Sequence, residues 1–260
     1  MPDADDPHPS HTGTDAFRYR QHGTPDGPTV ILLSGLFGSH INFERLLPHL
    51  TDAYHVVIPE LPLFTMPIRE LSLQRLVEYC EELIAHLALK DIHLVGNSLG
   101  GHIALLYALS NPTQVASLTL SGSSGLYESA LGTTLPKRND LDYLERKIRE
   151  TFYDGAHATP DLIEAISEMV NDRNKAIRIV ATAKSAVRQN LTEKLHQIAT
   201  PTLLIWGADD NVTPPFIGEQ FEELIDNAQL VVLPECGHAA MLEHPQEFAR
   251  HFTAFVESAS

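Results

Sequence analysis

Cysteine is nearly absent from this 260-residue sequence, which has only Cys80 and Cys236. One possible pair in a chain of this length is not a disulfide framework, so we expect a protein of the reducing cytoplasm. Long apolar runs are also missing, and no window approaches the roughly 18 apolar residues of a membrane span. The first residues, MPDADDPHPSHTGTDA, lack the basic start and apolar core of a secretory signal. We therefore expect no membrane attachment and a disordered tail over residues 1–15.

Basic residues are scarce as well. The 18 lysines and arginines against 34 aspartates and glutamates give a formal net charge of −16. A field of this sign opposes binding to nucleic acid and to anionic membranes. We expect the partner to be a small-molecule substrate, and the protein to be a monomer or a homodimer.

Motifs that hold cofactors are missing too. The glycines of GNSLGG do not have the spacing of a dinucleotide fingerprint, and the sequence has no Gly-Lys-Ser/Thr phosphate loop. Pairs of histidine and carboxylate at metal-ligand spacing are absent from the helical patterns. The sequence predicts an activity that needs no cofactor and no metal.

What is present is an alternation of apolar, β-rich runs with helical patterns. Helix spacing is clear over residues 72–89 and again over 100–110. A weaker run at 16–23 is expected at an antiparallel edge. The alternation predicts an α/β fold with a mostly parallel sheet and helices on both faces. The predicted strands lie in the ranges 29–35, 55–61, 92–98, 115–122, 201–207 and 228–234.

One gap interrupts this rhythm. Between the strand at 115–122 and that at 201–207 lie roughly 70 residues, too many for a loop. Helix signals, with Asp or Thr before the first turn, recur within this gap. We predict a helical cap over 126–199, inserted into a core domain made of 16–125 and 200–260. The helical patterns of the cap cover residues 139–154, 159–172, 172–188 and 191–198.

A serine lies at the junction of a predicted strand and helix. Residues 96–100 read Gly-Asn-Ser-Leu-Gly, the Gly-x-Ser-x-Gly form of a nucleophile elbow when a strand precedes it and a helix follows. A strained turn exposes the hydroxyl of Ser98, and side chains at the flanking positions would collide with the strand and helix. The alternative is a glycine-lined turn that merely includes a serine.

A serine nucleophile needs a base and an orienting acid. Asp209 and Asp210 follow the strand at 201–207, and His238 follows the next strand. The order Ser, Asp, His is the one expected for this elbow, and all three positions lie beyond the carboxyl ends of strands.

Each of these residues also has a simpler interpretation. Either aspartate is able to cap the helix that begins near Pro214, and His238 is able to serve only as a turn residue. His102 is one turn beyond Ser98 and is carried away along the helix axis, so we expect it to be a packing or surface residue. Three coincidences in the correct order are far less probable than one.

An acyl-transfer site also needs donors for an oxyanion. The backbone N–H of Leu99, directly after the serine, is one candidate. The second is expected from the loop SGLFG, where Gly35 and Gly38 let amides turn inward, with Leu36 as the donor and Phe37 beside it.

With these segments identified, the chain resembles the α/β-hydrolase superfamily over nearly all its length after the tail. GNSLGG, WGADDNVTPP and CGHAAMLEHPQEF resemble the nucleophile, acid and histidine segments of that family. The spacing usual in the family selects Asp210 over Asp209, which implies Ser98, Asp210 and His238 as catalytic residues.

Within the superfamily the chain is similar to the meta-cleavage-product hydrolases, which cut a carbon–carbon bond in 2-hydroxy-6-oxo-dienoates. This resemblance implies that Asn97 and Arg173 contact the substrate, and we expect Phe37 to do so as well. The alternative for Arg173 is a surface residue of the cap that pairs with Asp172 or a nearby glutamate. The chain departs from that branch at Ala239, where tryptophan is common, and at Ser34, where histidine is common. It also lacks the usual Asp-x-Pro-Gly turn in PELPLFTMP.

These observations lead to three functional hypotheses. The first is a carboxylesterase that cleaves small to medium acyl esters through an acyl-enzyme. The second is a carbon–carbon hydrolase for meta-cleavage products, with or without esterase activity. The third, from another class, is a ligand-binding, receptor-like module of this fold whose triad is slow or idle.

Overall fold

A computed structural model of the chain describes residues 17–126 and 140–259. The predicted tail at 1–15 and the first part of the predicted cap, 127–139, lie outside the described residues. No helix in the described ranges is both long and apolar enough to cross a bilayer.

The central sheet has seven strands in the order β1-β3-β2-β4-β5-β6-β7. The edge strand β1 runs antiparallel to β3, and every other neighbouring pair is parallel. The prediction of a mostly parallel sheet with an antiparallel edge is confirmed. The strands are β1 (Tyr19–Gly23), β2 (Thr29–Leu33), β3 (His55–Pro59), β4 (Ile92–Asn97), β5 (Val115–Ser121), β6 (Thr202–Gly207) and β7 (Ala228–Leu233).

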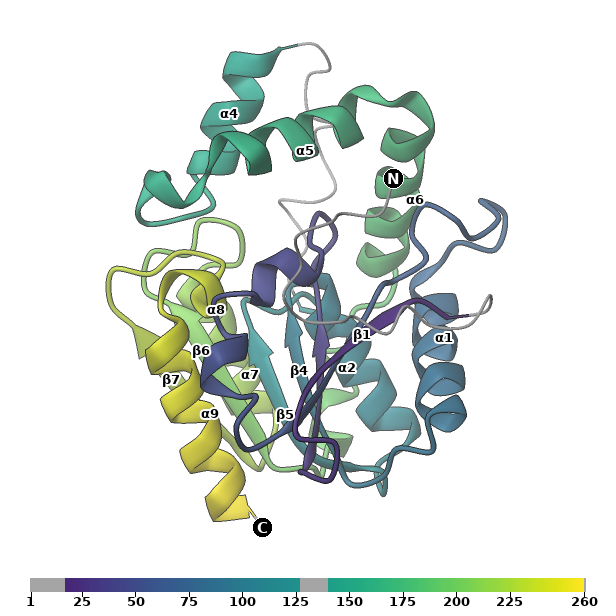
Figure 1. Cartoon of the computed structure of the whole chain (residues 1–260), viewed down its shortest axis with the longest axis vertical. Helices are drawn as coiled ribbons and strands as arrows, with labels where there is room; N and C mark the ends of the chain where they lie inside the picture. Colours follow the sequence, from purple (N-terminus) through teal and green to yellow (C-terminus); the bar gives the residue numbers. More distant parts are fainter. Residues whose placement is uncertain (1–16, 127–139, 260) are drawn as a thin grey trace.

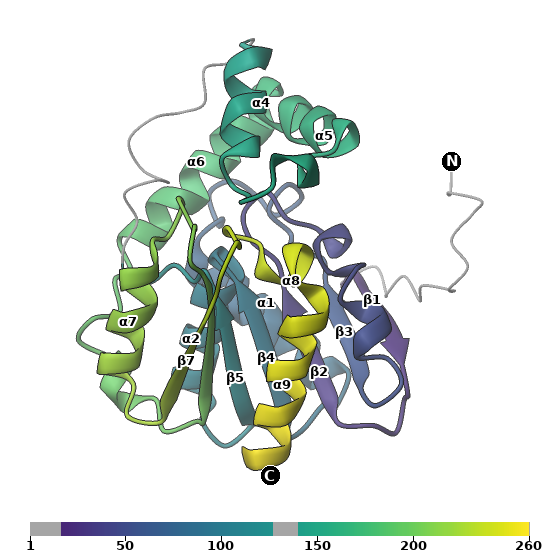
Figure 2. The same ribbon diagram turned by 90° about the vertical axis from the view of Figure 1, so that its left-hand side faces the viewer.

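Helices cover both faces of the sheet (Figures 1 and 2). Helices α1, α2 and α7 pack on one face, and α9 packs against β5 and β6 on the other. Helix α2 is apolar all round and nearly all of it is buried, as expected for a helix in the middle of a core. These helices are α1 (Leu73–His86), α2 (Leu99–Ser110), α7 (Pro215–Leu224), α8 (Ala240–Glu243) and α9 (Pro245–Ala259).

Between β5 and β6, the part of the chain that the structure describes contains three further helices: α4 (Leu141–Arg149), α5 (Pro160–Asn171) and α6 (Arg173–Val187). Both views show them together beyond one end of the sheet (Figures 1 and 2). Their starts carry the expected caps, because Asp140, Thr159 and Asp172 each accept a hydrogen bond from a first-turn N–H.

The helix expected over 191–198 is only a single 3-10 turn, η4 (Leu195–Gln197). Leu191, Leu195 and Ile198 of this segment are buried. The N–H of Leu191 donates to the carbonyl of Gly125, which ties this segment to the exit of β5. Within the segment, the N–H groups of Lys194, Gln197 and Ile198 donate to carbonyls three residues back, the spacing of a 3-10 turn. The remaining short helical turns are η1 (His40–Phe43), η2 (Leu47–His49) and η3 (Gly155–His157).

Candidate active site

Ser98 lies in a strained turn between β4 and α2. Its φ of +55° is in a region that non-glycine residues rarely adopt. A Cβ atom at Gly96 would lie 2.5 Å from the carbonyl oxygen of Gly100, and one at Gly100 would lie 2.0 Å from that of Leu33. Both flanking positions therefore require glycine, because the turn presses the start of α2 against β4 and β2.

Asp210 and His238 form a hydrogen-bonded pair at the neighbouring strand exits. Oδ2 of Asp210 is 2.9 Å from Nδ1 of His238, and both side chains are buried. Oδ1 of Asp210 accepts from the backbone N–H groups of Val212 and Thr213, and Oδ2 accepts from the Thr213 hydroxyl. These donors fix the orientation of the carboxylate, which in turn fixes the imidazole ring.

The structure separates the two candidate acids. Asp209 is exposed, and its N–H donates to the carbonyl of Cys236. Asp210 is only 3% exposed and contacts His238. Neither residue caps α7, whose N-cap is Pro214 with no side-chain hydrogen bond. The carboxylate that reaches the histidine is thus that of Asp210.

A loop after β5 packs against all three candidate catalytic residues. Gly122 has a φ of +51°, and a Cβ atom there would lie 2.7 Å from Nδ1 of His238 and 3.0 Å from Oδ2 of Asp210. The N–H of Ser124 donates to the carbonyl of Ser98 at 3.1 Å. Ser98, Asp210 and His238 therefore all lie around this loop, at the carboxyl ends of the strands.

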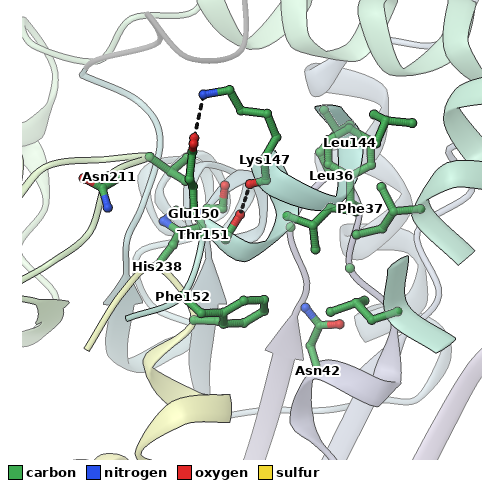
Figure 3. A pocket seen from close by; sticks show the side chains of 18 of the residues that line it. Leu36, Phe37, Asn42, Leu144, Lys147, Glu150, Thr151, Phe152, Asn211 and His238 are labelled. Carbon is green, nitrogen blue, oxygen red and sulfur yellow. Dashed lines mark hydrogen bonds and ion pairs between the residues drawn. The ribbon is translucent and has the colours of Figure 1, made fainter. Parts of the chain in front are cut away.

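Ser98 and His238 both line a cavity of about 450 Å³ (Figure 3). Most of its wall is apolar and comes from the loop after β2 and from α4, α5 and the segment after α4. Near Ser98 and His238 the lining side chains include Leu36, Phe37, Leu144, Ile148, Phe152 and Ile166. Lys147 and Glu150 of the same wall are paired, with Nζ 2.6 Å from Oε2.

The predicted oxyanion donors flank the serine. Leu99 is the first residue of α2, so its N–H has no acceptor one turn earlier in the helix. The loop that holds Leu36 comes close, since a Cβ atom at Gly35 would lie 3.2 Å from Cβ of Ser98. The N–H of Gly38 donates to the carbonyl of Gly35, which closes the turn around Leu36 and Phe37.

The predicted substrate contacts fall into two groups. Phe37 and Asn97 line the cavity, but the amide group of Asn97 donates to the carbonyls of Ser121 at 3.0 Å and His238 at 3.1 Å. Arg173 is the first residue of α6, is exposed, and is not among the residues that line the cavity. The structure does not bring Arg173 to Ser98.

His102, the other histidine near the serine, is fully buried. Its Nε2 is 2.9 Å from the carbonyl of Gln189, and its Nδ1 is 3.3 Å from the Ser124 hydroxyl. Burial lowers the pKa of His102 to about 4, so its ring is neutral at pH 7. It is a packing residue, as the sequence predicted.

Thr213, Gly122 and Lys147 were not identified from the sequence. Thr213 follows Asp210 by three residues, the spacing at which a carboxylate accepts from a backbone N–H, so a signal was present in ADDNVT. No local signal points to Gly122, whose close neighbours come from two other strand exits.

The residues at the cavity offer a hydroxyl, an imidazole and a carboxylate. Within residues 17–126 and 140–259, no group of three or more His, Cys, Asp or Glu side chains is arranged to hold a metal ion. The chemistry that these side chains support is nucleophilic attack assisted by a general base.

The chain was compared with known families and proteins. A model described as the alpha/beta hydrolase family matches residues 30–251. The chain is 34% identical, with a TM-score of 0.78, to the crystal structure of an alpha/beta hydrolase enzyme from the metagenome of lagoon sediments at Mar Chica, Morocco. That match covers 95% of this chain and 97% of the other.

Two named relatives point to different substrates. The chain is 32% identical to a 2-hydroxy-6-oxononadienedioate/2-hydroxy-6-oxononatrienedioate hydrolase of Cupriavidus pinatubonensis, over 65% of this chain and 63% of that protein. It is 28% identical to Lipase 1 of Psychrobacter immobilis, over 93% of this chain and 80% of the lipase. The match to the first of these thus spans less than two thirds of its length.

Proposed function

The chain belongs to the alpha/beta hydrolase family, and from that premise we propose that it is a serine hydrolase that cleaves carboxylic esters of small to medium acyl chains. The observation that carries the proposal is the buried Asp210–His238 pair, 2.9 Å apart, in one cavity with Ser98. The likeness to a lipase over 93% of the chain supports the ester as the bond that is cleaved.

In the proposed mechanism, His238 removes the proton of the Ser98 hydroxyl while Asp210 holds the ring and stabilises its charged form. The serine oxygen attacks the ester carbonyl, and the alcohol leaves with the proton that His238 returns. Water, deprotonated by the same histidine, then attacks the acyl-enzyme and releases the acid.

The backbone N–H groups of Leu36 and Leu99 are proposed to bind the oxyanion in both steps. Support comes from the position of Leu99 at the start of α2 and from the close approach of Gly35 to Ser98. Backbone donors of this kind are already oriented before the charge develops, so they stabilise the transition state without reorganising.

We propose that segment 126–199 is a cap and that its helices bind the acyl group. Leu144 and Ile148 of α4 and Ile166 of α5 contribute apolar side chains to the cavity above Ser98. Burying each methylene of an acyl chain against such a wall contributes about 0.8 kcal/mol. An apolar wall and the exposed position of Arg173 both favour an uncharged substrate.

The second candidate is carbon–carbon cleavage of a dienoate, and it is favoured by the name of the Cupriavidus relative. Such a substrate carries carboxylates and must become a ketone before its carbon leaving group is stabilised. Of the described residues that line the cavity, Lys147 is the one lysine or arginine, and it is paired with Glu150. A dienoate carboxylate would have to displace Glu150 from Lys147.

The test is a pair of kcat/KM values on purified protein, for a nitrophenyl butyrate ester and for a 2-hydroxy-6-oxo-dienoate, with Ser98→Ala as the background. The proposal expects the ester value to dominate and to disappear in Ser98→Ala. If the kcat/KM for the dienoate dominates, carbon–carbon cleavage takes the place of ester cleavage as the proposed function. No Ser98-dependent turnover of either substrate rejects both and favours a binding module.

The cytoplasm remains our proposal for the compartment, and a monomer or homodimer for the assembly. Both cysteines are free and buried, and burial raises the pKa of the Cys80 thiol to about 12. Free thiols are usual in a reducing compartment.

A further inference from the structure

The carboxylate of Glu243 joins two segments, at Tyr153 and Gly237, that lie 84 residues apart in the chain. Its Oε1 accepts from the N–H of Gly237 at 2.9 Å, and its Oε2 accepts from the N–H of Tyr153 at 2.8 Å. Gly237 immediately precedes His238, and Tyr153 follows the end of α4. Glu243 is the last residue of α8, so a helical turn packed on the core carries this carboxylate.

The two segments also touch each other directly. The N–H of His238 donates to the carbonyl of Thr151 at 2.8 Å. A Cβ atom at Gly237 would lie 2.6 Å from that carbonyl oxygen and 2.8 Å from Cα of Phe152. Only glycine fits at position 237. Residues 234–239, which carry His238 and are called the histidine loop below, therefore pack backbone against backbone with residues 151–153.

The carboxylate has a defined electrostatic setting. Burial raises the pKa of Glu243, because desolvation opposes its charge, while the N–H groups of Tyr153 and Gly237 and the charge of His157 act in the opposite direction. A half-buried carboxylate that accepts from two backbone donors makes charge-assisted hydrogen bonds, which are stronger than neutral ones.

The same two segments contribute to the cavity wall. His238, Thr151 and Phe152 all line it, and Figure 3 shows the last two beside His238. A displacement of the histidine loop therefore moves the base and one part of the wall together.

We propose that Glu243 is a positioning residue for His238. Its carboxylate fastens the histidine loop to residues 151–153, so that the imidazole stays aligned with Ser98. The inference rests on the proposed function, in which His238 is the base. Misplacing a catalytic group by about 1 Å lowers the rate by about a hundredfold. The two hydrogen bonds of Glu243, called the Glu243 bridge below, therefore act on the chemical step.

The test compares Glu243→Gln with the unaltered protein. Glutamine has the same length, but its NH2 group cannot accept a hydrogen bond, so one of the two N–H groups loses its partner. We expect kcat for a nitrophenyl ester to fall by about tenfold to a hundredfold, the effect of one lost charge-assisted bond, with KM within about twofold. The inactivation rate constant with a fluorophosphonate is expected to fall in parallel, because it reports the reactivity of Ser98.

Glu247→Gln is the matched control. Glu247 lies four residues on, is exposed, and pairs with Arg250 on the surface of α9. Its substitution makes the same chemical change without touching the histidine loop, and we expect both constants to stay within about twofold. Glu243→Asp is the second variant, since a shorter carboxylate cannot reach both N–H groups at once.

The outcomes separate this inference from the proposed function. Unaltered protein that neither turns over ester nor reacts with the fluorophosphonate rejects the proposed function. Unaltered protein that reacts normally, with Glu243→Gln and Glu243→Asp equally reactive, rejects the role of Glu243 alone. A rise in KM with unchanged kcat also rejects it, because the residue would then act on substrate binding.

A measurement on the unaltered protein covers the case in which the variants fail to fold. Native-state hydrogen exchange reports the opening of the amides of Tyr153, Gly237 and His238. A bridge that holds the two segments as one unit predicts protection factors for these amides that agree within about threefold, whereas a difference of more than about tenfold contradicts it.

Discussion

The side-chain amide of Asn97 donates a hydrogen bond to the carbonyl oxygen of His238, 3.1 Å away, and another to the carbonyl of Ser121. The residue before the nucleophile thus holds the histidine loop against the exit of β5. We predict that Asn97→Ala lowers kcat for an ester by about tenfold, the effect of one or two lost hydrogen bonds, with little change in KM.

Steady-state kinetics checks this prediction, with Asn111→Ala as the control. Asn111 lies just beyond the far end of α2, where its side chain bonds Glu81 and the carbonyl of Tyr107. A raised KM with unchanged kcat in Asn97→Ala would instead make Asn97 a substrate ligand, the role implied by resemblance to the meta-cleavage-product hydrolases.

The identity of the acid gives the second prediction. Asp210→Asn is expected to lower kcat by about 10³-fold to 10⁴-fold, because the amide no longer stabilises the charged histidine. Asp209→Asn is the matched control, since Asp209 is exposed and makes its hydrogen bond through the backbone. Equal losses in the two variants, measured as kcat for the same ester, would contradict the assignment.

Gly122 gives the third prediction. Gly122→Ala forces a Cβ atom to within 2.7 Å of Nδ1 of His238, at a φ of +51°. The ring must shift, and we expect kcat to fall by about a hundredfold. Gly155→Ala is the control, because the nearest atom to a Cβ there is 3.6 Å away. Unchanged kcat in Gly122→Ala would mean that the loop moves aside freely.

His102 predicts a pH dependence of stability. Its pKa is about 4 in the folded protein and about 6.5 in an unfolded chain, so between these pH values the unfolded chain binds a proton that the folded protein does not. The contribution of the neutral ring is complete above pH 6.5 and is lost as the pH falls toward 4. The loss amounts to about 3 kcal/mol of unfolding free energy.

Urea unfolding at several pH values checks this, with His102→Gln as the comparison, because glutamine keeps a donor for the carbonyl of Gln189. The difference in unfolding free energy between the two proteins is expected to change across the interval from pH 6.5 to 4. A difference that stays constant with pH would show that His102 does not titrate in this way. Comparing the two proteins removes the contributions of His55 and His93, whose pKa values burial also lowers.

The sequence predicted the sheet because buried parallel strands leave continuous apolar runs. LLIWG before Asp210 and LVGN before Ser98 both become fully buried strands, β6 and β4. The order of the candidate triad was readable for a related reason, since Ser98 directly follows β4, and Asp210 and His238 come within a few residues of the ends of β6 and β7. The choice of Asp210 needed family spacing, because its contact with His238 spans 28 residues.

Contacts between residues 140–199 and the rest of the described chain could not be predicted from the sequence. The periodicity of α6 gives the face that is buried but not where the helix lies over the sheet. The expectation that Arg173 contacts the substrate came from the family resemblance, which does not give the position of this helix either. The partners of Glu243 are backbone N–H groups, one of them 90 residues away, and every residue type except proline supplies such a donor. No pattern in the side chains marks them.

The most direct test of the central claim, that Ser98 is a nucleophile activated by His238 and Asp210, is the mass of the intact protein after reaction with a fluorophosphonate. We predict one adduct per chain, located on the peptide that contains Ser98, and none in Ser98→Ala or His238→Ala over the same time. Unaltered protein that stays unlabelled, or Ser98→Ala that is labelled equally, would contradict the account.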